Sequence, residues 1–77
     1  MITVRYFAAA EEAAGTAEER CRATSLDALR KTLVAEHPAL GPILPRCALL
    51  VDGTRHDGDT DLQTATFVDV LPPFAGG

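Results

Sequence analysis

The chain has 77 residues and a formal net charge of −4, from seven basic and eleven acidic side chains. Its basic residues are scattered singly or in pairs, whereas a nucleic-acid-binding protein concentrates them to neutralise phosphates, so nucleic acid and anionic membrane surfaces are disfavoured as partners. The length allows one small domain whose core is too small to enclose a deep active site, which favours a protein that works by docking to a larger one.

Two features of the composition indicate where the protein works. No run of about 18 apolar residues is present for a membrane-spanning helix, and the first residues lack the basic start and apolar stretch of a signal peptide. The two cysteines, Cys21 and Cys47, are too few and too far apart for a metal motif or a disulfide framework. We therefore expect free thiols in a reducing compartment and a cytoplasmic protein.

The first third of the chain predicts a strand, a short helix and a second strand. Residues 2–7 indicate a strand in which Ile2, Val4 and Tyr6 alternate with polar residues and face the core, whereas Phe7 falls on the other face. Residues 8–14 are alanine and glutamate, which favour a helix, and Gly15 is placed to end it. Residues 19–23 alternate again, and their charged side chains indicate a strand at the edge of a sheet.

The most regular helical pattern follows. Either Thr24 or Ser25 is a good N-cap, and Asp27, three residues after Thr24, suggests a variant of the capping box. Four apolar side chains then share one helical face. They are Leu26, Leu29, Leu33 and Val34. The pair His37-Pro38 ends the helix, because the residue before a proline avoids the α region.

The second half of the chain predicts an irregular connection and further strands. Residues 38–46 contain three prolines and a glycine, which indicates a stiff, irregular segment. Residues 47–51 are an apolar run suited to a buried strand, and Asp52-Gly53 is a strong hairpin-turn signal. A short return strand is expected within residues 54–60, and residues 66–71 alternate as a final strand. The element order fits an α+β domain in which a small mixed sheet packs on one main helix.

The end of the chain carries the most specific signal. After the last predicted strand the sequence reads Pro72-Pro73-Phe74-Ala75-Gly76-Gly77. Proline cannot donate a ladder hydrogen bond, so the sheet ends there, and glycine has no side chain to obstruct entry into a narrow channel. We therefore expect a domain at residues 1–71 and a flexible tail at residues 72–77 that presents its terminal carboxylate to another protein. Activation of that carboxylate as a mixed anhydride with AMP would open its carbonyl to a sulfur nucleophile.

These features together resemble a known family. The chain resembles the molybdopterin synthase small subunit (MoaD) in four features. They are the first strand followed by Phe7-Ala8, the helix end at Gly15, the helix with a leucine face, and the ending Leu71-Pro72-Pro73-x-x-Gly76-Gly77. Its close relative is the thiamine sulfur carrier (ThiS), and both are ubiquitin-like β-grasp proteins. The double proline before the terminal glycines favours the molybdopterin branch. The Gly-Asp turn that the family usually has before the last strand is replaced by Ala65-Thr66, and neither residue takes a left-handed turn easily.

The resemblance implies a mechanism and a set of partners. An ATP-using, MoeB-like adenylating enzyme would adenylate Gly77, and a sulfur donor protein would convert the acyl-adenylate into a thiocarboxylate. The tail would then enter the MoaE-like large synthase subunit and pass its sulfur to cyclic pyranopterin monophosphate in molybdenum cofactor biosynthesis. The chain would thus be a non-catalytic sulfur carrier with no permanently bound cofactor and no metal. The residues expected to contact partners are Phe7, Leu71, Pro72, Pro73, Phe74, Ala75 and Gly76.

Several alternatives stay open at this point. A sulfur carrier for thiamine or cysteine biosynthesis would differ in its partners and not in its tail. A ubiquitin-like modifier would couple Gly77 to lysines of other proteins, and an interaction module would tolerate the loss of both glycines. Phe7 is expected either to face outward near Phe67 or Leu71, as part of an interface, or to join a small cluster under the first helix.

The remaining polar and sulfur-containing residues predict structural roles. The acidic run at residues 57–61 begins like a calcium loop, but the glycine and bidentate glutamate of an EF-hand are missing, so a solvated turn is expected. His37 and His56 have no cysteine or carboxylate companions at metal-ligand spacing. Cys21 and Cys47 are expected to be small buried hydrophobic residues.

Overall fold

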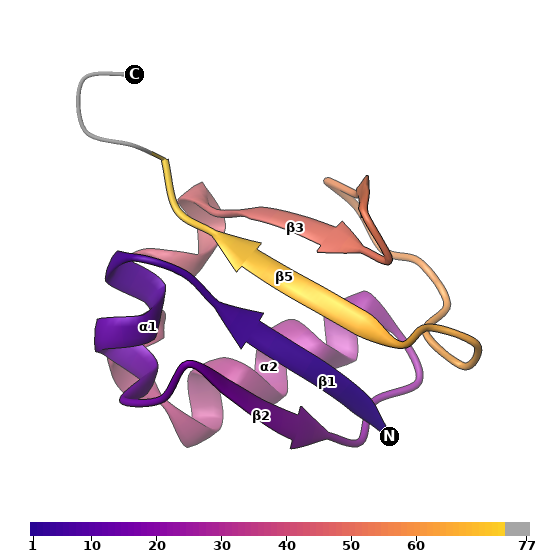
Figure 1. Cartoon of the computed structure of the whole chain (residues 1–77), viewed down its shortest axis with the longest axis horizontal. Helices are drawn as coiled ribbons and strands as arrows, with labels where there is room; N and C mark the ends of the chain where they lie inside the picture. Colours follow the sequence, from indigo (N-terminus) through magenta and orange to yellow (C-terminus); the bar gives the residue numbers. More distant parts are fainter. Residues whose placement is uncertain (74–77) are drawn as a thin grey trace.

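The computed structural model describes residues 1–73, and the tail residues Phe74, Ala75, Gly76 and Gly77 lie outside the described residues. A five-stranded mixed sheet forms one layer, and helix α2 (Leu26–Glu36) forms the other (Figure 1). The other elements, in chain order, are β1 (Ile2–Tyr6), α1 (Ala9–Ala14), β2 (Glu18–Cys21), the 3₁₀ helices η1 (Pro38–Leu40) and η2 (Leu44–Arg46), β3 (Ala48–Val51), β4 (Thr54–Arg55) and β5 (Phe67–Leu71). The predicted α+β architecture, with a mixed sheet on one main helix, is confirmed.

The first and last strands lie side by side in the centre of the sheet. The strand order is β2-β1-β5-β3-β4. Strands β1 and β5 run parallel, with Val4 opposite Val68, and β2 and β3 pair with them antiparallel on either side. The parallel pairing brings the ends of β1 and β5 to one end of the sheet, next to the start of β3 (Figure 1). The charged strand β2 lies at the edge, as the sequence predicts.

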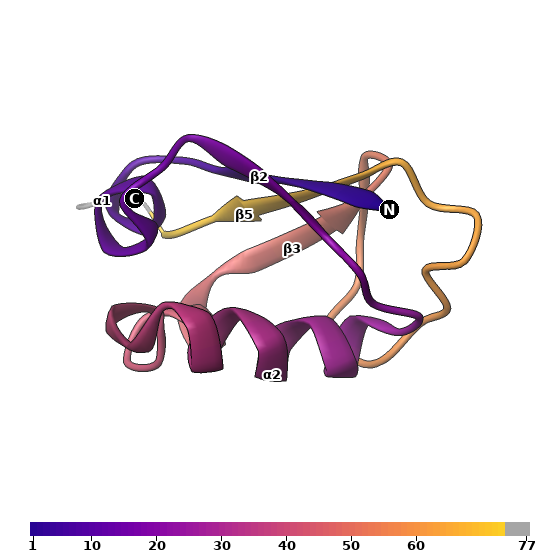
Figure 2. The same cartoon turned by 90° about the horizontal axis from the view of Figure 1, so that it is seen from below.

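One face of the sheet packs on α2 and makes the core (Figure 2). The buried strand residues are Ile2, Val4, Tyr6, Cys21, Leu49, Val68 and Val70. Helix α2 contributes Leu26, Leu29 and Leu33, which have no exposed surface, and each such side chain contributes about 1.5–3 kcal/mol on burial. The prediction for Val34 is wrong: it is 36% exposed, because it lies about 100° around the helix from Leu33. No helix within residues 1–73 has the length and apolar character needed to cross a membrane.

Local signals determine where the helices begin and end. Helix α1 ends at Gly15, whose φ of +76° is the left-handed conformation that glycine favours. Helix α2 begins after Ser25, whose Oγ accepts a hydrogen bond from the N–H of Ala28 at 3.2 Å, and it ends at His37. Since Ser25 holds the N-cap position, the capping box suggested from Thr24 does not form.

Asp52 organises two turns. Asp52 and Gly53 have φ angles of +47° and +87°, the conformation of the two-residue hairpin turn that the sequence predicts between β3 and β4. The Asp52 carboxylate also accepts hydrogen bonds from the N–H groups of Thr66 and Phe67, at 3.1 and 2.9 Å. Neither Ala65 nor Thr66 has a positive φ. A side chain from a distant turn therefore holds the start of β5, where the family usually has a Gly-Asp turn.

Two segments differ from the expectation. Residues 38–46 form the 3₁₀ helices η1 and η2 instead of an irregular connection, and each carries a proline in its first turn, where no N–H is needed. In β3 only Leu49 is buried, so the apolar run at residues 47–51 is not a fully buried strand. The face of β3 opposite α2 stays open, and its neighbour β4 is only two residues long.

Candidate functional site at the end of the central strands

Three strand ends meet where the chain leaves the sheet. Strand β5 ends at Leu71, which pairs with Ala48 at the start of β3. Phe7 follows directly after β1, and its N–H donates a hydrogen bond to a β5 carbonyl, that of Val70, at 3.2 Å. The exit of the chain is thus framed by the end of β1 on one side and the start of β3 on the other (Figure 1).

The two prolines after β5 have different surroundings. Pro72 is buried, whereas Pro73 is exposed. The side chain of Pro72 therefore anchors the exit to the domain, and the chain reaches the surface at Pro73. The other tail residues predicted to act, at positions 74–77, lie outside the described residues.

Phe7 lies on the face of the sheet opposite α2. Its exposed fraction is 42%, and it is absent from the buried core, so the outward orientation is the one observed. In the β1–β5 register Phe67 lies opposite Thr3, and Phe7 falls beside Leu71 at the other end of the strands. Of the two predicted neighbours, Leu71 is therefore the correct one. Phe7 and the partly exposed Leu71 together form an apolar surface at the exit of the tail.

The backbone turns away from the sheet at Ala8, two residues after the end of β1. Ala8 has φ +52° and ψ −127°, a conformation that costs about 1–3 kcal/mol for a residue with a Cβ atom. The chain turns there into α1, and the N–H groups of Ala10 and Glu11 bond the carbonyls of Phe7 and Ala8 at 3.0 Å each. The turn fixes the aromatic side chain at the end of the sheet.

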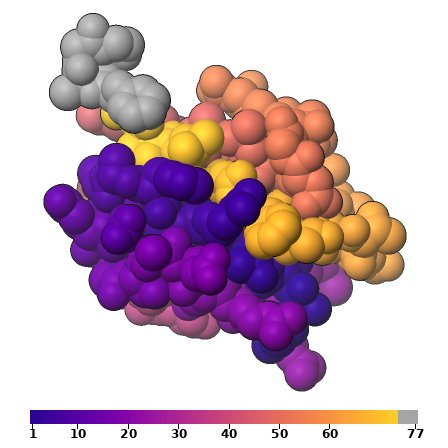
Figure 3. Space-filling view, viewed as in Figure 1, coloured from indigo at the N-terminus to yellow at the C-terminus, as the bar shows by residue number. Residues whose placement is uncertain are grey.

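The middle of the open face holds an ion pair. The Nε of Arg5 lies 2.5 Å from Oδ1 of Asp69, and the Nη2 of Arg5 lies 3.0 Å from Oδ2. The guanidinium and the carboxylate therefore form a bidentate pair. The guanidinium carbon is also 4.0 Å from the centre of the Phe67 ring. Hydrogen bonding to Asp69 raises the pKa of Arg5. Figure 3 looks onto this face, which no helix of residues 1–73 covers.

Neither thiol is suited to covalent sulfur chemistry. Burial, with the nearby charges of Glu19 and Glu36, raises the pKa of the Cys21 thiol to about 11. Burial also raises the pKa of Cys47, whose thiol donates to the carbonyl of Ile43 at 3.3 Å. Both are protonated, weak nucleophiles at neutral pH. The prediction of buried cysteines is confirmed for Cys21, whereas Cys47 is only partly buried.

The acidic run at residues 57–61 has the structural role that the sequence predicts. Asp59 accepts a hydrogen bond from the N–H of Asp27, at the start of α2, at 2.8 Å. Asp61 accepts one from the N–H of Gln63 at 3.2 Å, and Asp57 pairs with a neighbouring arginine. Asp59 and Asp61 therefore act as caps of the surrounding backbone.

The prediction that His37 lacks a carboxylate companion is wrong. Its Nε2 lies 2.5 Å from Oε2 of Glu19, and the hydroxyl of Tyr6 donates to the same oxygen at 2.6 Å. Glu19 belongs to β2, 18 residues before His37. No local spacing in the sequence reveals this contact, because the packing of α2 under the sheet creates it.

Comparisons with known proteins identify the fold and then the family. The chain is similar to the crystal structure of SAMP1 from Haloferax volcanii, with a TM-score of 0.84 and 21% sequence identity over 99% of this chain and 98% of that chain. The architecture is accordingly the ubiquitin-like β-grasp fold. The sequence profile of the ThiS family matches residues 4–77, so the chain belongs to the ThiS family of ubiquitin-like sulfur carriers. No curated protein sequence matches it significantly.

Proposed function

We propose that this protein carries sulfur as a thiocarboxylate at Gly77 and, as the small subunit of molybdopterin synthase, donates it to cyclic pyranopterin monophosphate. The observation that carries the proposal is the match to the ThiS family, which extends through Gly77, the last residue of the sequence. The two terminal residues are glycine, and the lack of a side chain leaves the carbonyl open to a nucleophile.

The chemistry takes place on the terminal carboxylate in two steps. A MoeB-like adenylating enzyme transfers AMP from ATP to the Gly77 carboxylate, and pyrophosphate leaves. The outer sulfur of a persulfide on a donor protein then attacks the carbonyl, and AMP leaves. A second thiol of the donor cleaves the resulting acyl disulfide, which leaves a thiocarboxylate on Gly77 and a disulfide on the donor. The thiols of Cys21 and Cys47 are protonated and partly or fully buried, so we assign the nucleophilic sulfur to a partner and not to this chain.

The apolar surface at the tail exit supports docking. Phe7 and Leu71 lie beside the strand ends from which Pro73 emerges, so a partner that takes up the tail also reaches this pair. Burial of an exposed aromatic side chain is a common source of binding energy in protein interfaces. Arg5 and Asp69 neutralise each other, so this pair requires no charged group from the partner. We assign this surface to the adenylating enzyme and to the MoaE-like large subunit in turn.

The choice of acceptor rests on the tail sequence. The Leu71-Pro72-Pro73-x-x-Gly76-Gly77 ending supports the molybdopterin branch, and the ThiS profile supports thiamine biosynthesis as the second candidate. Both use the same activated Gly77.

An acceptor competition separates the two branches. The thiocarboxylated protein is incubated with a molybdopterin synthase large subunit and cyclic pyranopterin monophosphate, and in parallel with the thiazole-forming enzyme of thiamine biosynthesis. We expect sulfur in the dithiolene of molybdopterin and the return of Gly77 to a carboxylate. Transfer into the thiazole alone would refute the molybdopterin assignment. A variant that lacks Gly77 serves as the control, because it cannot be charged.

A further inference from the structure

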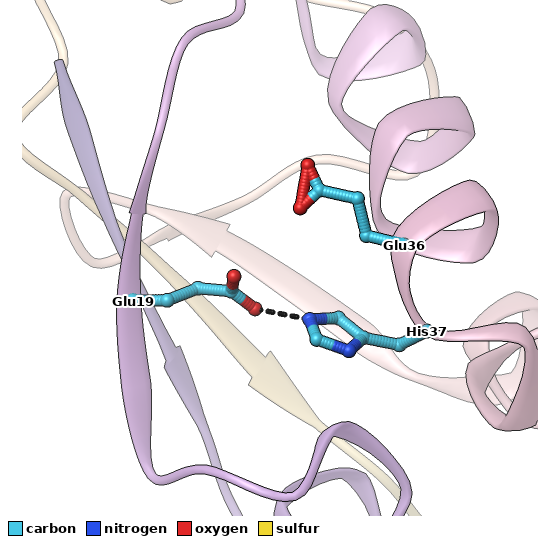
Figure 4. A group of neighbouring side chains, drawn as sticks. All are labelled: Glu19, Glu36 and His37. Atoms are coloured by element: carbon cyan, nitrogen blue, oxygen red, sulfur yellow. Dashed lines mark hydrogen bonds and ion pairs between the residues drawn. The ribbon is translucent and has the colours of Figure 1, made fainter.

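A cluster of potential metal ligands lies beneath the edge strand β2 (Figure 4). Glu19 is on the inner face of β2, opposite Val4 in the pairing with β1. Glu36 is the last residue of α2, and His37 is its C-cap. One ligand atom from each of the three side chains lies within 4.8 Å of the others. The cluster is at the opposite edge of the sheet from β4.

Two of these side chains are held in place. Glu19 Oε2 accepts the hydroxyl hydrogen of Tyr6 at 2.6 Å and lies 2.5 Å from Nε2 of His37. The rings of Tyr6 and His37 pack edge to face, with their centres 6.0 Å apart. The side chains of Glu19 and His37 are only 22% and 20% exposed. A carboxylate oriented by a tyrosine hydroxyl is a common arrangement around protein-bound metals, where outer groups fix the ligands.

The third side chain has no partner of its own. Within residues 1–73, Glu36 makes no side-chain hydrogen bond and no ion pair, although it lies at the same cluster. It stands at the C-terminal end of an 11-residue helix, where the exposed carbonyls carry negative partial charge. The last turn of α2 contains no basic residue. Two carboxylates and a helix C-terminus therefore meet with a single histidine, which leaves negative charge that a cation would neutralise.

We propose that Glu19, Glu36 and His37 bind a divalent transition-metal ion of the zinc type. One imidazole nitrogen and two carboxylate oxygens are ligands that Zn²⁺ accepts, with water in the fourth position. Ligand atoms of a tetrahedral zinc site lie about 3.3 Å apart, given bonds of about 2.0 Å. The contact between His37 and Glu19 must therefore lengthen by less than about 1 Å, and the exposed Glu36 side chain must move closer.

The bound ion would connect β2 to the end of α2. Among the described residues, β2 is an edge strand paired only with β1, so a bond across to the helix adds a restraint at the edge of the sheet. An ion that binds only the folded state raises the unfolding temperature, and the rise grows with the logarithm of the free ion concentration above the dissociation constant. Mg²⁺ prefers six oxygen ligands and should have little effect.

The test uses the full chain without a histidine tag. Calorimetric titration with Zn²⁺ is expected to show one ion per chain, and Co²⁺ is expected to give the visible absorption of a tetrahedral site. Glu36→Gln should weaken Zn²⁺ binding at least about tenfold, and so should His37→Asn. The informative variant is Glu36→Gln. Glu36 is exposed, and its side chain makes no hydrogen bond or ion pair within residues 1–73, so a purely structural cluster predicts no effect on Zn²⁺ binding.

Glu12→Gln is the matched control, since Glu12 is also an exposed helical glutamate and lies outside the cluster. Its Zn²⁺ affinity should equal that of the parent chain. The proposal is overturned if the parent chain does not bind Zn²⁺. It is also overturned if Glu36→Gln binds as tightly as Glu12→Gln, which would assign the ion to another place on the surface. Circular dichroism confirms that each variant is folded before titration.

Discussion

Replacement of Phe7 by alanine should weaken partner binding far more than replacement of a comparably exposed residue elsewhere. Phe7 is 42% exposed beside Leu71 at the tail exit, whereas Val34 is 36% exposed on the surface of α2. The exposed fractions of these two apolar residues are therefore similar. Only Phe7 lies on the open face of the sheet, next to the segment that the proposal places inside the partner.

The magnitude follows from the exposed area of the ring. A phenylalanine side chain has about 200 Å² of surface, and 42% of this is about 85 Å². If docking buries that area at about 25 cal/mol per Å², Phe7→Ala loses about 2 kcal/mol of binding free energy. Since about 1.4 kcal/mol is a factor of ten, the dissociation constant should rise roughly 30-fold. Val34→Ala should change it less than about twofold.

The assay is calorimetric titration of each variant into the large subunit of molybdopterin synthase. Urea unfolding is measured alongside, because the inner part of the Phe7 side chain packs against the domain and its loss lowers stability. Binding is compared at a temperature at which both variants are fully folded. Equal dissociation constants for Phe7→Ala and Val34→Ala would refute the assignment of the docking surface.

Three further predictions concern the domain itself. Asp52→Gly keeps the left-handed turn but removes the acceptor for the amides of Thr66 and Phe67. The free energy of unfolding, measured in urea, should fall by about 2 kcal/mol. A fall of less than about 0.5 kcal/mol would mean that water replaces the Asp52 carboxylate as acceptor. Leu29→Ala empties a position with no exposed surface and should cost about 3 kcal/mol, and a variant as stable as the parent chain would contradict the packing of α2 on the sheet. The pKa of Cys21 is raised from 9.0 to about 11, so above pH 9 the unfolded chain loses its thiol proton first. The contribution of this thiol to stability should be constant below pH 9 and be lost as the pH rises toward 11, so stability should fall less steeply over that range in Cys21→Ala.

The parts of the fold that follow short-range rules could be predicted from the sequence. Alternation gave β1 its buried face, because successive side chains of a strand point to opposite sides. Gly15 and the Asp52-Gly53 pair have the positive φ angles that their positions require. The helix ended at His37 because Pro38 follows it. Each of these features depends on neighbours in the chain, so the amino-acid pattern contains the information.

Features that depend on contacts between distant segments were missed. The Glu19–His37 contact exists because α2 packs beneath an edge strand, and the cap that Asp52 gives to Thr66 joins residues 14 positions apart. The sequence predicts Val34 on the buried face, because four apolar residues form a wide apolar stripe along the helix. The sheet covers only the part of this stripe that carries the three leucines. At the candidate site, the sequence indicates that Phe7 could contact a partner but does not determine which way its side chain faces. The register between β1 and β5 decides that orientation.

The intact mass of the protein isolated from its own cells tests the central claim most directly. It is compared with a variant that lacks Gly77 and is prepared in the same way. We expect a fraction of the parent protein that is heavier by the exchange of one oxygen for sulfur, located at Gly77, and no such fraction in the variant. A parent protein without this sulfur while its partners are active, together with full function of the shortened variant, would contradict the sulfur-carrier account.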